Sequence, residues 1–158
     1  MIAQVTGRVV GRGGDGVVLE VGGVGLEVVA TRGAEAVARP GTTVTLQTHL
    51  HVREDALQLF GFADVGERRL FRLLLGVSGV GPRLALAVVS AYPPDQLARA
   101  IVASDVALLS SVSGVGKRTA ERICLDLRER IAKLPAAPRT SPRGVDPTPA
   151  TPGPDLED

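Results

Sequence analysis

Short runs of Val and Leu alternate with polar positions over residues 1–62, and this period of two is typical of β-strands. Five segments show the pattern, at residues 2–10, 15–23, 24–30, 43–52 and 56–62. The glycine pairs Gly13-Gly14 and Gly22-Gly23 fall between strands, and we expect turns with positive φ at both. One short helix fits between the third and fourth strands. An α+β protein is therefore predicted, in which residues 1–63 form a five-stranded OB-type barrel; a generic five-stranded meander is the alternative.

From Asp64 onward the apolar positions recur with a helical period. Asp64 and Glu67 have the spacing of a capping box at the start of a helix. In ERRLFRLLL the leucines Leu70, Leu73 and Leu74 share one face, and the three arginines lie largely off it. Further helices are predicted at residues 82–91, 94–103, 105–110 and 117–133. Residues 64–134 are thus expected to form an all-α domain.

The last segment, residues 135–158, has a different composition. Seven of its 24 residues are Pro, and only Val145 and Leu156 are large and apolar. Such a segment buries too little apolar surface to offset its ordering entropy. We expect a Pro-rich disordered tail.

The pentapeptide VSGVG occurs twice, at Val77–Gly81 and Val112–Gly116. Around it, residues 73–89 and 108–124 are identical at nine of 17 positions. Glycine permits a tight turn between two helices, and the second glycine of each copy opens the next helix. The first amides of that helix, beside the positive end of its dipole, suit a phosphate. A compact helix–turn–helix loop without a ligand is the alternative. A Walker A loop is excluded, because Ser111 and Arg118 stand where its Gly and Ser/Thr are required.

The charge of the chain is distributed unevenly among its three segments. The net charge is −1 over residues 1–63, +4 over residues 64–134 and −2 over residues 135–158. The segment with both glycine turns is therefore the basic one, which suits phosphates, although ordinary scatter would also give this value. A single cysteine, Cys124, allows no disulfide within the chain, and no apolar stretch approaches 18 residues. We expect a cytoplasmic protein.

Candidate catalytic and metal-binding groups are few. His49 and His51 lie two apart on one strand and face the same side, but no third ligand is near. Cys124 falls on the apolar stripe of the last predicted helix, which indicates a buried structural thiol. We expect no metal, no cofactor and no active site.

The paired G-V-G turns resemble tandem helix-hairpin-helix motifs, which bind DNA backbones without reading sequence. Over residues 1–134 the chain further resembles the RuvA family of bacterial proteins that recognise Holliday junctions. The matching stretches are EVGGVGLEV, THLHVREDALQLFGF, RRLFRLLLGVSGVGPRLALAVVS and VSGVGKRTAERICLDLRERI. The resemblance implies a non-catalytic homotetramer or octamer that holds a four-way junction open in DNA recombination and repair. It also implies a hexameric RuvB-type ATPase motor and a RuvC-type resolving nuclease as partners.

The resemblance assigns roles to nine residues of this chain. It implies backbone-binding positions in the two hairpins at Gly79, Gly81, Arg83, Gly114, Gly116, Lys117 and Arg118. It also implies an acidic pin at Glu54 and Asp55, in HVREDAL. Members of this family usually continue into a third domain that docks on the motor, and we expect this domain to be absent here. Two other functions stay open: a repair glycosylase or nuclease delivered by the hairpins, and a scaffold that does not touch DNA.

Overall fold

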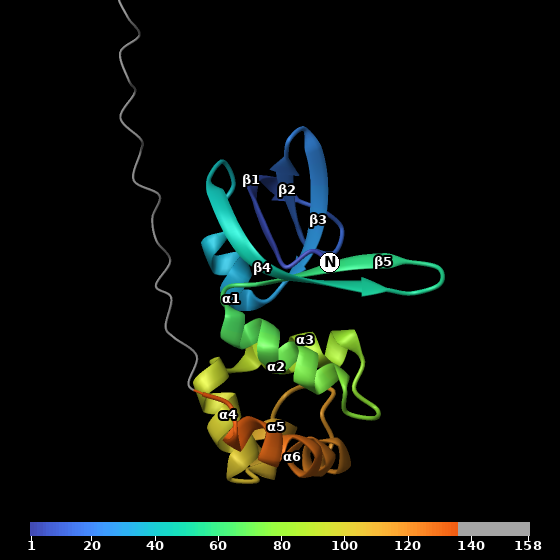
Figure 1. Ribbon diagram of the computed structural model, residues 1–158, viewed down its shortest axis with the longest axis vertical. Coiled ribbons are helices and arrows are strands. Elements are labelled where there is room, and N and C mark those ends of the chain that lie inside the picture. Colours follow the sequence, from blue (N-terminus) through green and yellow to red (C-terminus); the bar gives the residue numbers. More distant parts are fainter. Residues whose placement is uncertain (136–158) are drawn as a thin grey trace, which may run out of the picture.

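The computed structural model describes residues 1–135, in which a β-barrel stands on a group of helices (Figure 1). The predicted Pro-rich tail lies, apart from Pro135, outside the described residues. The barrel comprises β1 (Gln4–Arg12), β2 (Val17–Val21), β3 (Val24–Ala30), α1 (Arg32–Val37), β4 (Thr43–Val52) and β5 (Leu57–Phe62). The helices below it are α2 (Val65–Leu75), α3 (Pro82–Ala91), α4 (Pro94–Val102), α5 (Val106–Ser110) and α6 (Lys117–Ala132).

The five strands close in the order β1-β2-β3-β5-β4, which confirms the OB-type barrel. All neighbouring strands are antiparallel except β3 and β5, which run parallel. Alternate residues point inward, as the period of two predicts. The barrel core consists mainly of Val and Leu side chains: Val5, Val9, Val17, Leu19, Val28, Leu46 and Leu59.

The glycine pairs that separate the strands behave differently. Gly22 and Gly23 have φ of 57° and 86°, as expected for the tight turn between β2 and β3. The expectation of positive φ at Gly13-Gly14 is wrong. The loop there is longer and is closed by a hydrogen bond from the Gly13 N–H to the Gly16 carbonyl (2.8 Å). It is therefore not one of the two-residue hairpin turns, type I′ or II′, that require positive φ.

The helical stripe predicted for α6 is buried along its whole length. Ala120, Ile123, Cys124, Leu127 and Ile131 all pack into the lower core, and burial raises the pKa of the Cys124 thiol. Cys124 is thus the buried thiol that the sequence indicates.

An aromatic cluster joins the barrel to the helices. Phe71 on α2 is fully buried, and its ring centroid lies 5.1 Å from that of Phe60 and 4.9 Å from that of Phe62. The sequence pattern placed Leu73 on the buried face of α2, yet Leu73 is only partly buried. Phe60 and Phe62 belong to β5 but pack into the core of the helices, so this core reaches the barrel, whose interior is a second, separate cluster.

Glu67 forms a second connection between the two parts. Asp64 caps α2 as predicted, its carboxylate accepting a hydrogen bond from the Glu67 N–H (2.8 Å). Glu67 does not return the bond to Asp64, as a capping box requires. Its Oε2 instead accepts from the Ala63 N–H (2.8 Å) and from the Thr31 hydroxyl (2.7 Å), which caps α1. Burial, assisted by Asp64, raises the pKa of the Glu67 carboxyl against the opposing effect of these hydrogen bonds.

We expect Glu67→Gln to keep both hydrogen bonds and to remove the cost of burying a charge. A raised pKa in the folded state contributes stability at low pH that is lost as the pH rises above the ordinary value of 4.5. The unfolding free energy of Glu67→Gln should therefore rise relative to the parent between about pH 5 and about pH 8. Urea denaturation at both pH values measures this difference. Glu67→Ala is the control, since it orphans two donors and should cost about 1–3 kcal/mol.

Candidate nucleic-acid interface

The two VSGVG segments adopt the same backbone conformation. Gly79 and Gly114 have φ of 85° and 91°, a left-handed region in which L side chains are strained. The following valines, Val80 and Val115, are buried, and each N–H donates to the carbonyl three residues earlier, at 3.1 Å and 3.0 Å. These two valines anchor the turns to the core.

The second glycine of each segment is the N-cap of the next helix. Gly81 precedes α3 with φ −90°, and Gly116 precedes α6 with φ −80°, both ordinary extended conformations. A Cβ atom at either position would meet nothing within 4 Å. Ser, Asp or Asn would cap these helices better than Gly, so neither backbone conformation nor protein packing explains the glycine. Its absence of a side chain leaves the first amides of each helix uncovered for an approaching anion.

The two hairpins lie next to each other. A Cβ atom on Gly114, in the second hairpin, would lie 3.3 Å from Cδ1 of Leu84, in the first turn of α3. The small residues Ala85 and Ala120, one turn into α3 and α6, are completely buried. The fold thus brings the N-termini of α3 and α6, 35 residues apart in sequence, into one surface.

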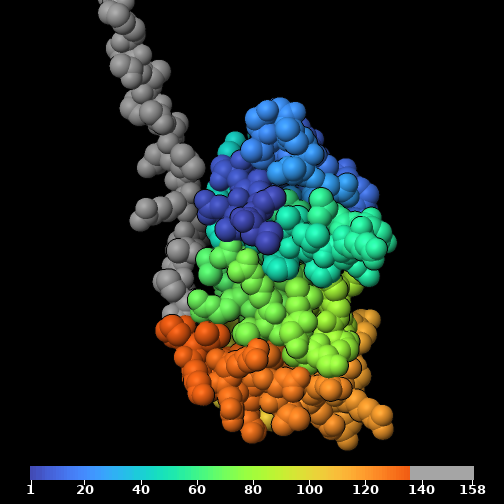
Figure 2. Space-filling model, turned by 45° about the vertical axis from the view of Figure 1, so that its right-hand side comes forward, coloured from blue at the N-terminus to red at the C-terminus, as the bar shows by residue number. Residues whose placement is uncertain are grey.

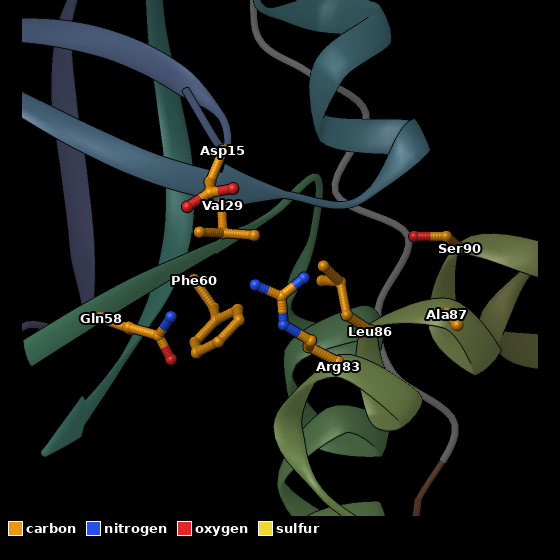
Figure 3. Close-up of a pocket in the computed structure, with 8 residues that line it drawn as sticks. All are labelled: Asp15, Val29, Gln58, Phe60, Arg83, Leu86, Ala87 and Ser90. Carbon is orange, nitrogen blue, oxygen red and sulfur yellow. The ribbon is translucent and has the colours of Figure 1, made fainter. Parts of the chain in front are cut away.

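The basic residues of the two hairpins are placed differently. Lys117 and Arg118 are exposed in the first turn of α6, beside its uncovered amides. Figure 3 shows the Arg83 guanidinium extending toward the barrel, over a groove of about 220 Å³ whose lining includes Asp15, Gln58 and Phe60. Within residues 1–135 Arg83 forms no ion pair. The second hairpin therefore combines amides and charge, whereas the first offers mainly amides.

The acidic residues lie at the end of a projecting arm. Glu54 and Asp55 are exposed in the turn between β4 and β5, which is closed by a hydrogen bond from the Arg53 N–H to the Ala56 carbonyl (2.8 Å). This hairpin runs past the body of the barrel (Figure 1) and forms the teal projection on the right of Figure 2. The turn after α2, which carries Gly79, projects in the same direction in Figure 1.

An apolar pair at the base of this turn was missed by the sequence analysis. Val52 and Leu57 are cross-strand partners, and 60% and 71% of their surfaces are exposed. Their signal in the sequence is an apolar residue on each side of the polar turn, which resembles any β-hairpin until exposure is known.

His49, one of the two histidines on β4, contacts a basic residue of α2. The Arg72 Nε–H donates to Nδ1 of His49 (3.3 Å), and burial, followed by the positive charge of Arg72, lowers the pKa of His49. No group of three or more His, Cys, Asp or Glu side chains in the described part of the chain could hold a metal ion. None of the helices in residues 1–135 is long and apolar enough to span a bilayer.

Two family models match this chain. Residues 1–61 match the RuvA N terminal domain, and residues 71–129 match the SAM-like helix-hairpin-helix tandem. The protein named Holliday junction branch migration complex subunit RuvA from Thermobifida fusca is 51% identical over 133 residues, 84% of this chain and 66% of that protein. The proteins of the same name from Herpetosiphon aurantiacus and Geobacter sulfurreducens are 48% and 42% identical, over 89% and 87% of this chain and 72% and 70% of theirs. With the barrel, the paired hairpins and these relatives in agreement, the chain belongs to the RuvA family.

Proposed function

We propose that this protein binds four-way DNA junctions through their backbone phosphates and holds them for branch migration by a partner ATPase. The observation that carries the proposal is the pair of N-cap glycines, Gly81 and Gly116, whose identity the fold itself does not require. Two uncovered helix N-termini side by side can each take a phosphate without reading a base. In this proposal residues 1–63 are the barrel domain and residues 64–134 the DNA-binding domain.

The acidic tip supplies preference for a junction over plain duplex. Glu54 and Asp55 stand on an arm directed to the same side as the first hairpin, so a continuous duplex laid on that side would bring phosphates near two carboxylates. An open junction has a gap between its arms where the carboxylates meet no backbone. The tip therefore disfavours duplex and leaves junction binding unopposed.

Glu54→Gln combined with Asp55→Asn is expected to raise affinity for linear duplex by up to about tenfold at low salt, because it removes like-charge repulsion. Affinity for a four-way junction should change less. Fluorescence anisotropy with both DNAs measures the two affinities. Asp126→Asn with Glu129→Gln removes the same charge from exposed positions on α6 and is the matched control. Unchanged duplex binding, or an equal rise in the control, would contradict the prediction.

Several copies are needed to surround four DNA arms, and we propose a homotetramer, alone or as two stacked tetramers. The Val52–Leu57 pair on the arm supports a contact between copies, since both side chains are apolar and more than half exposed in the described chain. Light scattering should give a mass of four or eight chains. Leu57→Asp should lower that mass, and a monomer in the unsubstituted protein would refute the proposal.

The ATP-driven step belongs to the partner in this proposal. The relatives are named as subunits of a branch migration complex, and a hexameric RuvB-type motor and a RuvC-type nuclease are the partners proposed for this chain. The protein itself supplies a shaped, phosphate-binding platform and no chemical step.

A gel-shift comparison of a four-way junction with linear duplex of equal length tests the proposal. Tighter binding of the junction is expected, and equal affinity would overturn it. Incubating labelled junction with the pure protein and Mg²⁺ tests the glycosylase or nuclease alternative, which requires cleavage or base release. A scaffold without DNA contact would show no shift with either DNA.

A further inference from the structure

Four arginines gather around one hollow on the side of the helical layer. Arg68, Arg69 and Arg72 come from α2 and Arg130 from the last turn of α6, and with Leu73 they line a hollow of about 380 Å³. The red-orange end of α6 lies directly below the green surface of α2 in Figure 2. We call this site the arginine pocket.

No carboxylate within residues 1–135 forms an ion pair with any of these four guanidinium groups. The hydrogen bonds found for them go from Arg68 to the Ala3 carbonyl and from Arg72 to the neutral nitrogen of His49. Burial and the charge of Arg72 lower the pKa of Arg68, and the same positive charges act on His49. Four uncompensated charges held together repel one another, and an anion in the pocket would relieve this repulsion.

The pocket is separated from the hairpins along α6. Lys117 is at the N-terminal end of this helix and Arg130 near its C-terminal end, about 20 Å apart at the rise of an α-helix. A backbone phosphate on the uncovered amides of α6 therefore does not occupy the pocket. The pocket also contains an apolar side chain, Leu73, which a phosphate would leave without a partner.

We propose that the arginine pocket binds the acidic segment Asp155–Asp158 of the same chain. This segment, Asp-Leu-Glu-Asp, carries three carboxylates around one leucine, which complements four guanidinium groups around Leu73. Arginine forms bidentate hydrogen bonds with carboxylates, so the match is geometric as well as electrostatic. Asp155 is 20 positions after Pro135, which an extended chain can span over up to about 66–72 Å, and Arg130 lies only five positions before Pro135. Binding within one chain gains from a high effective concentration.

The main test uses the full chain without DNA, so its outcome is independent of the proposed function. A nitroxide label on Thr151→Cys reports proximity to the pocket, and Cys124 is too buried to compete for the label. The amide resonances of Arg69 and Arg72 should be broadened by the label. Asp155→Asn, Glu157→Gln and Asp158→Asn together should lower that relaxation enhancement at least about twofold, because the gain from effective concentration is lost. Arg130 is not used as a reporter, since it lies close to the attachment of the segment.

Two further variants make the result specific. Arg69→Gln with Arg130→Gln should release the acidic segment from the pocket. The relaxation enhancement at the Arg72 amide should then fall as far as it does when the segment itself is neutralised. Arg118→Gln with Arg122→Gln removes the same charge from the other end of α6 and should leave the enhancement unchanged. Equal enhancement with acidic and neutral segments overturns the proposal. A second result would also overturn the proposal. If added junction DNA shifted the Arg69 and Arg72 resonances of the protein with its native acidic segment as strongly as the Lys117 resonance, the pocket would be a DNA site.

Discussion

Gly116→Ser is expected to lower affinity for a four-way junction by about tenfold to a hundredfold, without destabilising the protein. Gly116 has φ −80° and open space at its Cβ position, so serine fits without strain. A serine N-cap hydroxyl accepts hydrogen bonds from the first turn of α6, which should raise the unfolding free energy by a few tenths of a kcal/mol. The same hydroxyl occupies the amides that a phosphate would use, and each charged hydrogen bond lost costs about 1.5–3 kcal/mol of binding. Anisotropy and urea denaturation measure the two effects.

Gly114→Ala is the matched control for this substitution. Gly114 has φ 91° and lies 3.3 Å, measured from a Cβ position, from Leu84, so alanine should cost about 1–2 kcal/mol of stability. Substitution of Gly116 is thus expected to lower the affinity for DNA, whereas substitution of Gly114 is expected to lower the stability of the fold. A Gly116→Ser protein that binds junctions with unchanged affinity would show that the α6 amides do not hold DNA.

Lys117→Gln with Arg118→Gln is expected to flatten the salt dependence of junction binding by close to two phosphate contacts. Each contact contributes about 0.9 to the slope of log affinity against log salt concentration on duplex DNA. Both side chains are exposed beside the uncovered amides of α6. Arg83→Gln should change the slope less, because the Arg83 guanidinium extends over the groove toward the barrel (Figure 3). Titrations at several salt concentrations give the slopes.

Arg128→Gln with Lys133→Gln removes two exposed charges, one near the C-terminal end of α6 and one at its C-cap, and controls for net charge. Its slope should stay near that of the parent. If Arg83→Gln flattened the slope as much as the double substitution in α6, the asymmetry between the hairpins would be wrong.

Local pattern predicted most elements of this fold because their causes are local. The period of two marks the strands, Pro82 and Pro94 start α3 and α4, and Asp64 and Asp105 cap α2 and α5 through hydrogen bonds to nearby amides. The expectation at Gly13-Gly14 failed because a glycine pair does not reveal the length of its loop. Phe71 was overlooked because its importance depends on Phe60 and Phe62, which the barrel brings to it.

The sequence by itself determined the repeat of VSGVG, the helix starts that follow it and the strand pattern of the barrel, since each depends on residues a few positions apart. Only the tertiary structure decided which glycines the fold needs, because the need depends on φ and on neighbouring atoms: Gly79 and Gly114 have positive φ, and Gly81 and Gly116 do not. It also decided that the exposed Arg83 side chain turns toward the barrel while those of Lys117 and Arg118 stand in the first turn of α6. The arginine pocket needs residues 57 or more positions apart, from α2 and α6, and such proximity arises only when the helices pack.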